Sequence, residues 1–328
     1  MSRGSSLLEG FTESGSTGEV TQFALAGGLG VNPRPPVPVP GGSKELPEVL
    51  CGRYRLEEML GVGGMGVVYR ARDLLHEQFG DPDPFIAIKL LNEDFAEAPD
   101  AGVLLYREFA LTRHLCHHHI VRIHAFEVDL TYRKVFITQD LLRGIGLDKL
   151  LCEQPMGLNT AQMQAVAVPL LDALAHSHGS GVLHGDLKPG NIMLTDDGPR
   201  LIDFGLGGTL HGVLNGLPRL SRDRFNAWTP SYAAPELLSG EAPSPGTDVY
   251  AMGCVIYELA GGKHPFNKKP SQAKDEQLWR SLRAPPNLPI RFWPALRHSL
   301  AFDAHKRTIS AEELRDAFCT RPIGRMQF

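Results

Sequence analysis

The sequence has few cysteines, and those it has are scattered. The five are Cys51, Cys116, Cys152, Cys254 and Cys319, and no two of them form a C-x-x-C pair. Small secreted domains that depend on disulfides carry many more cysteines for their length, and usually an even number of them. The cysteines therefore predict free or buried thiols in a reducing compartment rather than a disulfide framework.

Long apolar runs and a strong excess of charge are also lacking. No segment approaches the roughly 18–20 uninterrupted apolar residues that span a membrane, and the N-terminus has no apolar signal core before a small-residue cleavage site. The formal net charge is only −4, which argues against a general binder of nucleic-acid backbones. We therefore expect a cytoplasmic protein with no membrane span and no nucleic-acid partner.

The residues that are present are sufficient for a hydrophobic core. Hydrophobic residues make up 42% of the 328, which excludes wholesale disorder and fits two compact units or one two-lobed unit. Residues 1–50 differ, because a Gly- and Ser-rich stretch is followed by the run PRPPVPVPGG. Such a run favours extended polyproline II. We expect a disordered tail here; the alternatives are a partner-binding motif and a segment that folds back on the domain.

Strand patterns come first along the chain and helical patterns follow. Residues 54–73 predict two strands around a glycine-rich turn, and further strands are expected at 84–91, 121–128 and 134–142. A single helix is predicted between them, at 101–115. Beyond Gly144 the clearest segments are helices, at 160–178, 247–262 and 310–318. The chain is thus expected to form a small sheet-rich unit and a larger helical unit.

The glycine-rich turn carries the first chemical signal. Gly61, Gly63 and Gly66 have the spacing G-x-G-x-x-G, which lets a backbone approach phosphate groups closely. Alone this signal is weak, but the turn lies between two strands rather than opening a helix, which disfavours a dinucleotide-binding site. Lys89 ends the strand motif IAIK, where it would clamp phosphates if a carboxylate oriented it. Glu108 on the following helix is the candidate partner.

The decisive segment is HGDLKPGNIML (184–194), followed by Asp203-Phe204-Gly205. Here the sequence resembles the Hanks-type (eukaryotic-like) protein kinases, in particular their bacterial serine/threonine members. The resemblance covers about residues 52–320, and includes TPSYAAPE (229–236), Asp248 and Arg307. It implies an α+β, two-lobed protein kinase fold. The implied divisions are a tail at 1–50, an N-terminal lobe at 51–142, a C-terminal lobe at 143–321 and a short tail at 322–328.

The resemblance also implies roles for the residues of this segment. Asp186 would accept the proton of the substrate hydroxyl, and Lys188 would neutralise charge on the transferred phosphoryl group. Asn191 and Asp203 would bind Mg²⁺, with Mn²⁺ as an alternative, because hard cations prefer oxygen ligands. Thr229 is expected to contact Asp186 and Lys188 through its hydroxyl.

ATP would lie between the two lobes. By resemblance, Lys89 contacts its α and β phosphates and Glu108 holds Lys89. The residues expected around the nucleotide are Leu60, Gly61, Gly63, Gly66, Val68, Ala87 and Met193, with backbone groups of Asp140 and Leu142 reading the adenine edge and Gln139 at the gatekeeper position. Glu236 and Arg307 would form a buried ion pair, and Asp248 would support the catalytic loop.

The expected function is an ATP-dependent serine/threonine protein kinase that also phosphorylates itself, with protein substrates and a cognate phosphatase as partners. The alternatives are a pseudokinase that acts as a scaffold or nucleotide sensor, and a kinase for a small molecule. One departure from the family pattern stands out, because His184-Gly185-Asp186 replaces the usual His-Arg-Asp. We therefore expect activity that does not depend strongly on phosphorylation at Thr209 or Ser221. The alternative is that an arginine at 219, 222 or 224 binds the phosphate instead.

Overall fold

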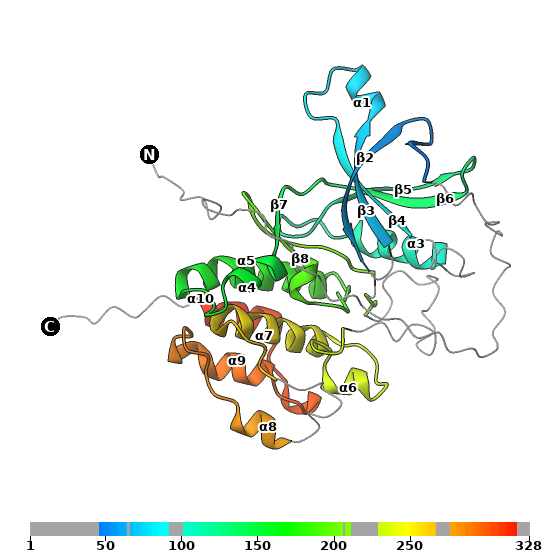
Figure 1. Cartoon of the computed structure of the whole chain (residues 1–328). Helices are drawn as coiled ribbons and strands as arrows, with labels where there is room; N and C mark the ends of the chain where they lie inside the picture. The colour runs from blue at the N-terminus through cyan, green and yellow to red at the C-terminus, as the bar shows by residue number, and fades with distance from the viewer. Residues whose placement is uncertain are drawn as a thin grey trace.

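The structure is a computed structural model that describes residues 46–63, 66–91, 101–205, 207–210, 229–266 and 276–319. It has two lobes (Figure 1). The smaller lobe is a six-stranded sheet in the order β1-β2-β3-β4-β6-β5, packed against helix α3, and the larger lobe is mainly helical. The larger lobe also carries a three-stranded sheet, β7-β8-β9. The tails expected at 1–50 and 322–328 lie mostly outside the described residues.

The strands of the larger sheet are antiparallel throughout. They are β1 (Val49–Leu50), β2 (Tyr54–Val62), β3 (Gly66–Asp73), β4 (Phe85–Leu91), β5 (Ile123–Asp129) and β6 (Lys134–Gln139). The small sheet consists of β7 (Gly144–Gly146), β8 (Ile192–Thr195) and β9 (Gly198–Leu201). Five strands of the larger sheet, β2 to β6, and the glycine-rich turn follow the predicted pattern, whereas β1 falls within the last residues of the expected tail. Its residue Leu50 is fully buried beside Tyr54 and Phe136.

The described helices are more numerous than predicted. They are α1 (Leu74–Gln78), α3 (Ala101–Thr112), α4 (Leu147–Glu153), α5 (Thr160–Gly179), α6 (Pro235–Leu238), α7 (Pro245–Gly261), α8 (Glu276–Ser281), α9 (Trp293–Ser299) and α10 (Ala311–Cys319). Single 3₁₀ turns occur at Pro189–Asn191, Ile290–Phe292 and Ala304–Lys306. The helix expected at 101–115 ends at Thr112, followed by a turn. None of the described helices is both long and apolar enough to cross a membrane.

Alternation along β4 places its side chains on two faces. Ile88 and Leu90 are buried with Leu50, Tyr54 and Phe136 on the side away from α3. Ala87 and Lys89 point to the opposite face, because successive side chains of a strand alternate. Lys89 pairs across the sheet with Val68 of β3, and Ala87 pairs with Gln139 of β6. Three residues expected to contact ATP, Val68, Ala87 and Lys89, therefore share one face of the sheet.

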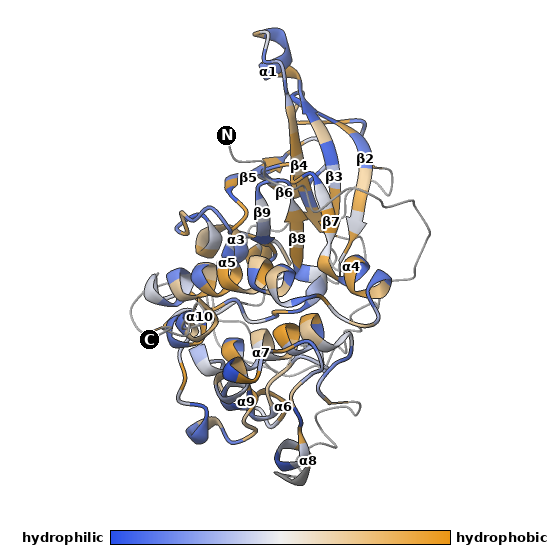
Figure 2. Ribbon diagram, turned by 90° about the vertical axis from the view of Figure 1, so that its left-hand side faces the viewer, coloured by the Kyte–Doolittle hydropathy of each residue, from blue (hydrophilic) through white to orange (hydrophobic). Residues whose placement is uncertain are grey.

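The core of the larger lobe is formed around α5 and α7. Asn159 caps α5 with a capping box to Gln162, and the helix continues through Pro169. Proline inside a helix costs about 3 kcal/mol, but Leu170, Leu171 and their neighbours are fully buried, so tertiary packing outweighs that cost. Figure 2 shows that β4 and β8, one in each lobe, are mostly hydrophobic.

Two buried threonines differ in what their hydroxyls contact. Thr138 of β6 accepts a hydrogen bond of 3.1 Å from the backbone N–H of Ala125, where the pairing of β5 with β6 shifts register. Thr112, at the end of α3, is 1% exposed, and its hydroxyl has no hydrogen-bond partner among the described residues. The Thr138 hydroxyl therefore supplies an acceptor for a backbone N–H at a bulge, whereas the Thr112 hydroxyl is buried without a hydrogen bond to offset its desolvation.

This contrast predicts opposite effects of two similar substitutions. Thr112→Val should leave the free energy of unfolding unchanged or raise it by up to about 1 kcal/mol, because it removes a buried hydroxyl that has no partner. Thr138→Val should lower it by about 1–2 kcal/mol, because the Ala125 N–H loses its acceptor. Urea unfolding followed by tryptophan fluorescence measures both. Equal losses of stability in the two variants would contradict the contrast.

Candidate active site

A buried lysine joins the two lobes through two carboxylates. The Lys89 ammonium lies 2.7 Å from both carboxylate oxygens of Glu108 on α3. It also lies 3.0 Å from Oδ1 of Asp203, which follows β9 in the larger lobe. The side chains of Lys89 and Glu108 are nearly inaccessible, while that of Asp203 is 35% exposed. The predicted Lys89–Glu108 pair is therefore formed, and its ammonium also reaches the predicted metal ligand.

Burial and charge act in opposite directions on these three groups. Burial and the negative charge of Asp203 raise the pKa of Glu108 to about 7, although Lys89 opposes the shift. Burial also opposes ionisation of Asp203, but the Lys89 ammonium prevails and holds the pKa of Asp203 below its usual range. Two carboxylates thus share one ammonium, and this surplus of negative groups suits the approach of a cation.

The β8–β9 hairpin brings the two predicted metal ligands to one end of the small sheet. Asn191 immediately precedes β8, Asp203 follows β9, and Ile192 pairs with Leu201. The Asn191 side-chain amide donates to the backbone oxygen of Asp186 at 2.8 Å and to its carboxylate at 3.3 Å. Its side-chain oxygen is then the atom left to bind a cation. Oxygen donors of this kind fit Mg²⁺.

Asp186 is surrounded by donors that fix its carboxylate. Lys188 Nζ lies 2.8 Å from Oδ2, and the backbone N–H of Thr229 donates to Oδ1 at 3.2 Å. Lys188 also donates to the Thr229 hydroxyl at 2.8 Å. The expected contact of Thr229 with Lys188 is therefore formed through the hydroxyl, whereas the hydrogen bond from Thr229 to Asp186 comes from the backbone N–H.

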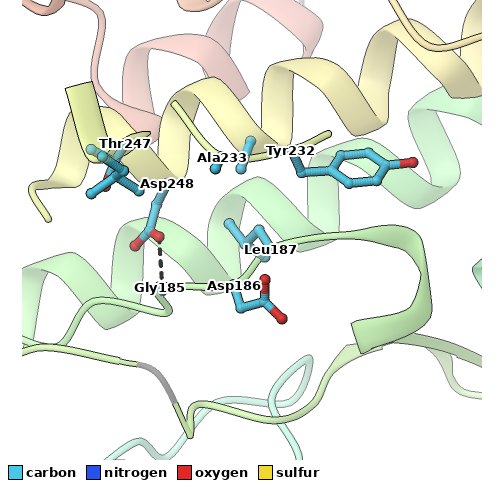
Figure 3. Close-up of a pocket in the computed structure, with 9 residues that line it drawn as sticks. Gly185, Asp186, Leu187, Tyr232, Ala233, Thr247 and Asp248 are labelled. Atoms are coloured by element: carbon cyan, nitrogen blue, oxygen red, sulfur yellow. Dashed lines mark hydrogen bonds between the residues drawn. The ribbon is translucent and has the colours of Figure 1, made fainter. Parts of the chain in front are cut away.

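Asp248 of α7 holds the loop that carries Asp186. Its carboxylate accepts hydrogen bonds of 2.9 Å from the backbone N–H groups of both His184 and Gly185, and Figure 3 shows Asp248 reaching the loop from α7. Burial opposes its ionisation, but His178 and these N–H groups hold the pKa of Asp248 below its usual range. Gly185 has φ +84°, a left-handed conformation that favours glycine. The expected support by Asp248 is thus formed.

Aromatic packing seats the segment that begins at Asp203. Phe204 is fully buried, and its ring centroid lies 4.5 Å from that of His184. Asp203 itself has φ +64°, and its carboxylate accepts from the N–H of Gly205 at 3.2 Å. Burial of Phe204 against the catalytic loop directs the adjacent Asp203 toward Lys89. Two kinds of contact therefore fix Asp203: the packing of Phe204 on His184, and the hydrogen bonds that the Asp203 carboxylate accepts from Lys89 and Gly205.

The residues expected around the nucleotide come from both lobes and from the connection between them. In the glycine-rich turn, the N–H of Gly63 donates to the carbonyl of Gly66 at 2.8 Å. A Cβ on Gly66 would lie 2.2 Å from the backbone oxygen of Leu90, so only glycine fits there. The other expected contact residues are distributed as follows: Leu60 and Gly61 on β2, Val68 on β3, Ala87 on β4, Asp140 and Leu142 in the connection between the lobes, and Met193 on β8. No ligand contact tests them, so their roles stay predictions.

A buried ion pair supports the larger lobe below the site. Arg307 Nη1 lies 2.6 Å from Glu236, and the guanidinium also donates to the carbonyls of Ala301 and Gly246. It lies over the ring of Tyr250 at 4.9 Å. Glu236 is the second residue of the short helix α6, which follows the segment that contacts Asp186. The predicted Glu236–Arg307 pair is therefore present and ties that segment to the core.

Comparison with known proteins agrees with this geometry. The sequence profile of the protein kinase domain matches residues 54–315. The chain belongs to the protein kinase family. Among solved structures, the kinase domain of PknI from Mycobacterium tuberculosis superposes with a TM-score of 0.61 at 26% identity, covering 82% of this chain and 96% of that one. The predicted resemblance and the two-lobed kinase fold are therefore confirmed.

Curated relatives in the kinase family are named as serine/threonine-protein kinases. PkaA of Streptomyces coelicolor is 33% identical over 272 residues, which are 80% of this chain and 48% of PkaA. A probable kinase, PknB of Corynebacterium glutamicum, is 31% identical over 66% of this chain and 33% of its own length. The chain thus spans about half or less of the length of these two relatives.

One residue near the site was missed from the sequence. Arg107, which precedes Glu108, is 9% exposed and donates to the carbonyl of Gly207 at 3.1 Å. The signal was its position, because Leu104, Arg107 and Leu111 have the three- and four-residue spacing of a buried helical stripe. A charged residue at such a position indicates a specific partner.

The Arg307–Glu236 pair predicts a large loss of stability when it is broken from one side. Arg307→Met should lower the free energy of unfolding by about 3–5 kcal/mol, because it leaves a buried carboxylate without its cation. Adding Glu236→Gln should recover part of that loss by removing the uncompensated charge. Chemical unfolding of both variants tests this. A loss below about 1 kcal/mol for Arg307→Met would show that the pair does not anchor the lobe.

Proposed function

We propose that this chain is an ATP-dependent serine/threonine protein kinase, which transfers the γ-phosphoryl group of ATP to serine and threonine hydroxyls of proteins, including its own. The observation that carries this proposal is the setting of Asp186. Its carboxylate faces Lys188 at 2.8 Å, beside Asn191 and near the end of the hairpin that carries Asp203. Phosphoryl transfer needs such positioned charges more than covalent chemistry.

The chemistry of the donors supports Mg²⁺ and ATP as the partners of this cleft. Protein kinases use both, and the oxygens of Asp203 and Asn191 would hold the metal, with Mn²⁺ as an alternative. When bound, the metal neutralises phosphate charge. Lys89 is already oriented by Glu108, with two contacts of 2.7 Å, and would bind the α and β phosphates. The glycine-rich turn would cover the phosphates with its backbone N–H groups.

The chain's own residues would then carry out the transfer. Asp186 orients the substrate hydroxyl and takes its proton as the hydroxyl oxygen forms a bond to the γ-phosphorus. The bond between that phosphorus and the bridging oxygen breaks, and ADP leaves. Lys188 neutralises charge on the phosphoryl group during the transfer. The contact between Lys188 and Thr229 at 2.8 Å links this step to the segment TPSYAAPE, which in protein kinases forms the peptide platform.

The alternatives are less well supported. A pseudokinase would lack at least one catalytic group, whereas Lys89, Glu108, Asp186, Asn191 and Asp203 are all present. A small-molecule kinase has no need of the peptide platform that TPSYAAPE supplies. The names of the relatives favour serine and threonine substrates. We further propose a cytoplasmic location and a separate phosphatase that reverses the reaction.

Removing the proton acceptor tests this function. Asp186→Asn should lower kcat at least about a hundredfold while ATP still binds, because the lost group acts on the nucleophile. Lys89→Ala should also nearly abolish turnover. Transfer from radiolabelled ATP with Mg²⁺ to a generic protein substrate measures kcat. The control is Asp196→Asn, an exposed aspartate on the β8–β9 turn. Wild-type autophosphorylation by Asp186→Asn would show that Asp186 is not the catalytic aspartate.

Gly185 predicts a second kinetic property. It offers no cation beside Asp186, so a phosphate in the following segment cannot be paired there. The double substitution Thr209→Ala, Ser221→Ala should therefore leave kcat within a few-fold of the parent. Thr209 is exposed, and Ser221 lies outside the described residues. The test is to compare kcat of phosphatase-treated and untreated enzyme. A hundredfold drop in kcat after treatment would refute the prediction.

A further inference from the structure

We propose that Arg107 is a positioning residue, which holds α3 in the orientation that Glu108 needs by binding the carbonyl of Gly207. The segment from Phe204 to Glu236, which follows Asp203, is called the activation segment below. The inference rests on the proposed kinase function. It adds a contact between α3 and the activation segment that requires no phosphate.

Arg107 and Glu108 are neighbours on α3 but have partners in different lobes. Consecutive helical residues are about 100° apart around the axis, so their side chains leave in different directions. Glu108 reaches Lys89 of β4, in the smaller lobe. Arg107 Nη2 instead donates to the carbonyl of Gly207, one hundred positions further along the chain, at 3.1 Å. The helix is thus held at adjacent residues by both lobes.

The carbonyl that Arg107 binds is held firmly in place. A Cβ on Gly207 would lie 2.5 Å from the backbone oxygen of Leu183 and 2.7 Å from that of Phe204. The Gly207 N–H donates to the carbonyl of Phe204 at 2.9 Å. This close packing leaves room for glycine alone, so the peptide at Gly207 has little freedom to move.

The residues after Gly207 are bonded to the chain that leads into the catalytic loop. The N–H of Leu183 donates to Gly208 at 2.9 Å, and that of Leu210 donates to Gly181 at 2.8 Å. Thr209 and Val182 form an antiparallel bridge between them. Leu183 is directly followed by His184-Gly185-Asp186. Through Gly207, Arg107 therefore connects α3 to the backbone that carries the catalytic aspartate.

Burial makes this hydrogen bond matter more. Desolvation lowers the pKa of Arg107, so the guanidinium depends on protein acceptors in place of water. A bond from a charged donor to a carbonyl is stronger than one between neutral groups. Gly185 supplies no cation that a phosphate could bind to order the activation segment. The Arg107–Gly207 hydrogen bond instead connects the start of this segment to α3, and it needs no phosphorylation.

Substitution of Arg107 tests the proposal through kinetics. Arg107→Met keeps the buried aliphatic stem, and should lower kcat at least tenfold with the KM for ATP within about threefold, because α3 no longer holds Glu108 against Lys89. Arg107→Lys should recover most of the loss, since an ammonium can also donate to the carbonyl. Arg113→Met, which changes an exposed arginine just beyond α3, is the matched control and should keep the wild-type kcat.

A double-substitution cycle separates positioning from a general structural role. If Arg107 acts through Glu108, adding Arg107→Met to Glu108→Gln should lower kcat less than twofold further. Hydrogen exchange of the α3 amides should be faster in Arg107→Met than in Arg113→Met, and this readout needs no activity. Unchanged kcat and unchanged exchange in Arg107→Met would overturn the proposal, as would a full tenfold further loss in the Glu108→Gln background. Wild-type protein without any phosphoryl transfer would instead refute the proposed function, while the exchange result would still decide the role of Arg107.

Discussion

The arrangement of the two lobes depends on two carboxylates that share one buried ammonium. Lys89 comes from the sheet of the smaller lobe, Glu108 from its helix and Asp203 from the larger lobe. The Lys89 ammonium lies within 3.0 Å of an oxygen of each carboxylate. A buried charge is costly unless it is paired, so each partner restricts where the others can lie. This meeting point restrains both the position of α3 and the end of the β8–β9 hairpin.

The loops around the site depend on buried charges for a similar reason. The catalytic loop has irregular backbone, whose N–H groups need partners other than a strand or helix. Asp248 accepts two of these N–H groups, and Arg307 binds the carbonyls of Ala301 and Gly246 as well as Glu236. Ionised side chains, Asp248 from α7 and Arg307 from the chain after a 3₁₀ turn, thus supply hydrogen bonds that regular secondary structure does not supply there. The site can therefore be irregular in backbone and still well ordered.

Sequence patterns predicted what depends on spacing and missed what depends on distant contacts. The order and spacing of the kinase motifs indicated the fold and the Lys89–Glu108 pair, whereas the contact of Lys89 with Asp203 was not predicted. The Arg107–Gly207 bond was not predictable, because it joins residues far apart in the chain and ends on a carbonyl that any residue possesses. Likewise, no pattern showed that Thr229 would bond to Asp186 through its backbone rather than its hydroxyl. Such details depend on how the folded segments approach one another.

The conformation of Gly185 has a consequence for how this catalytic loop can change over evolutionary time. At φ +84°, any residue with a Cβ would be strained by about 1–2 kcal/mol. An arginine at this place therefore loses loop stability, and retains an advantage only where a phosphate arrives to bind it. Glycine has the opposite effects, because it removes the backbone strain but leaves no cation to bind that phosphate. Reintroducing the arginine would bring back the strain at once, whereas phosphate-dependent control would return only if a phosphate on the activation segment came within its reach.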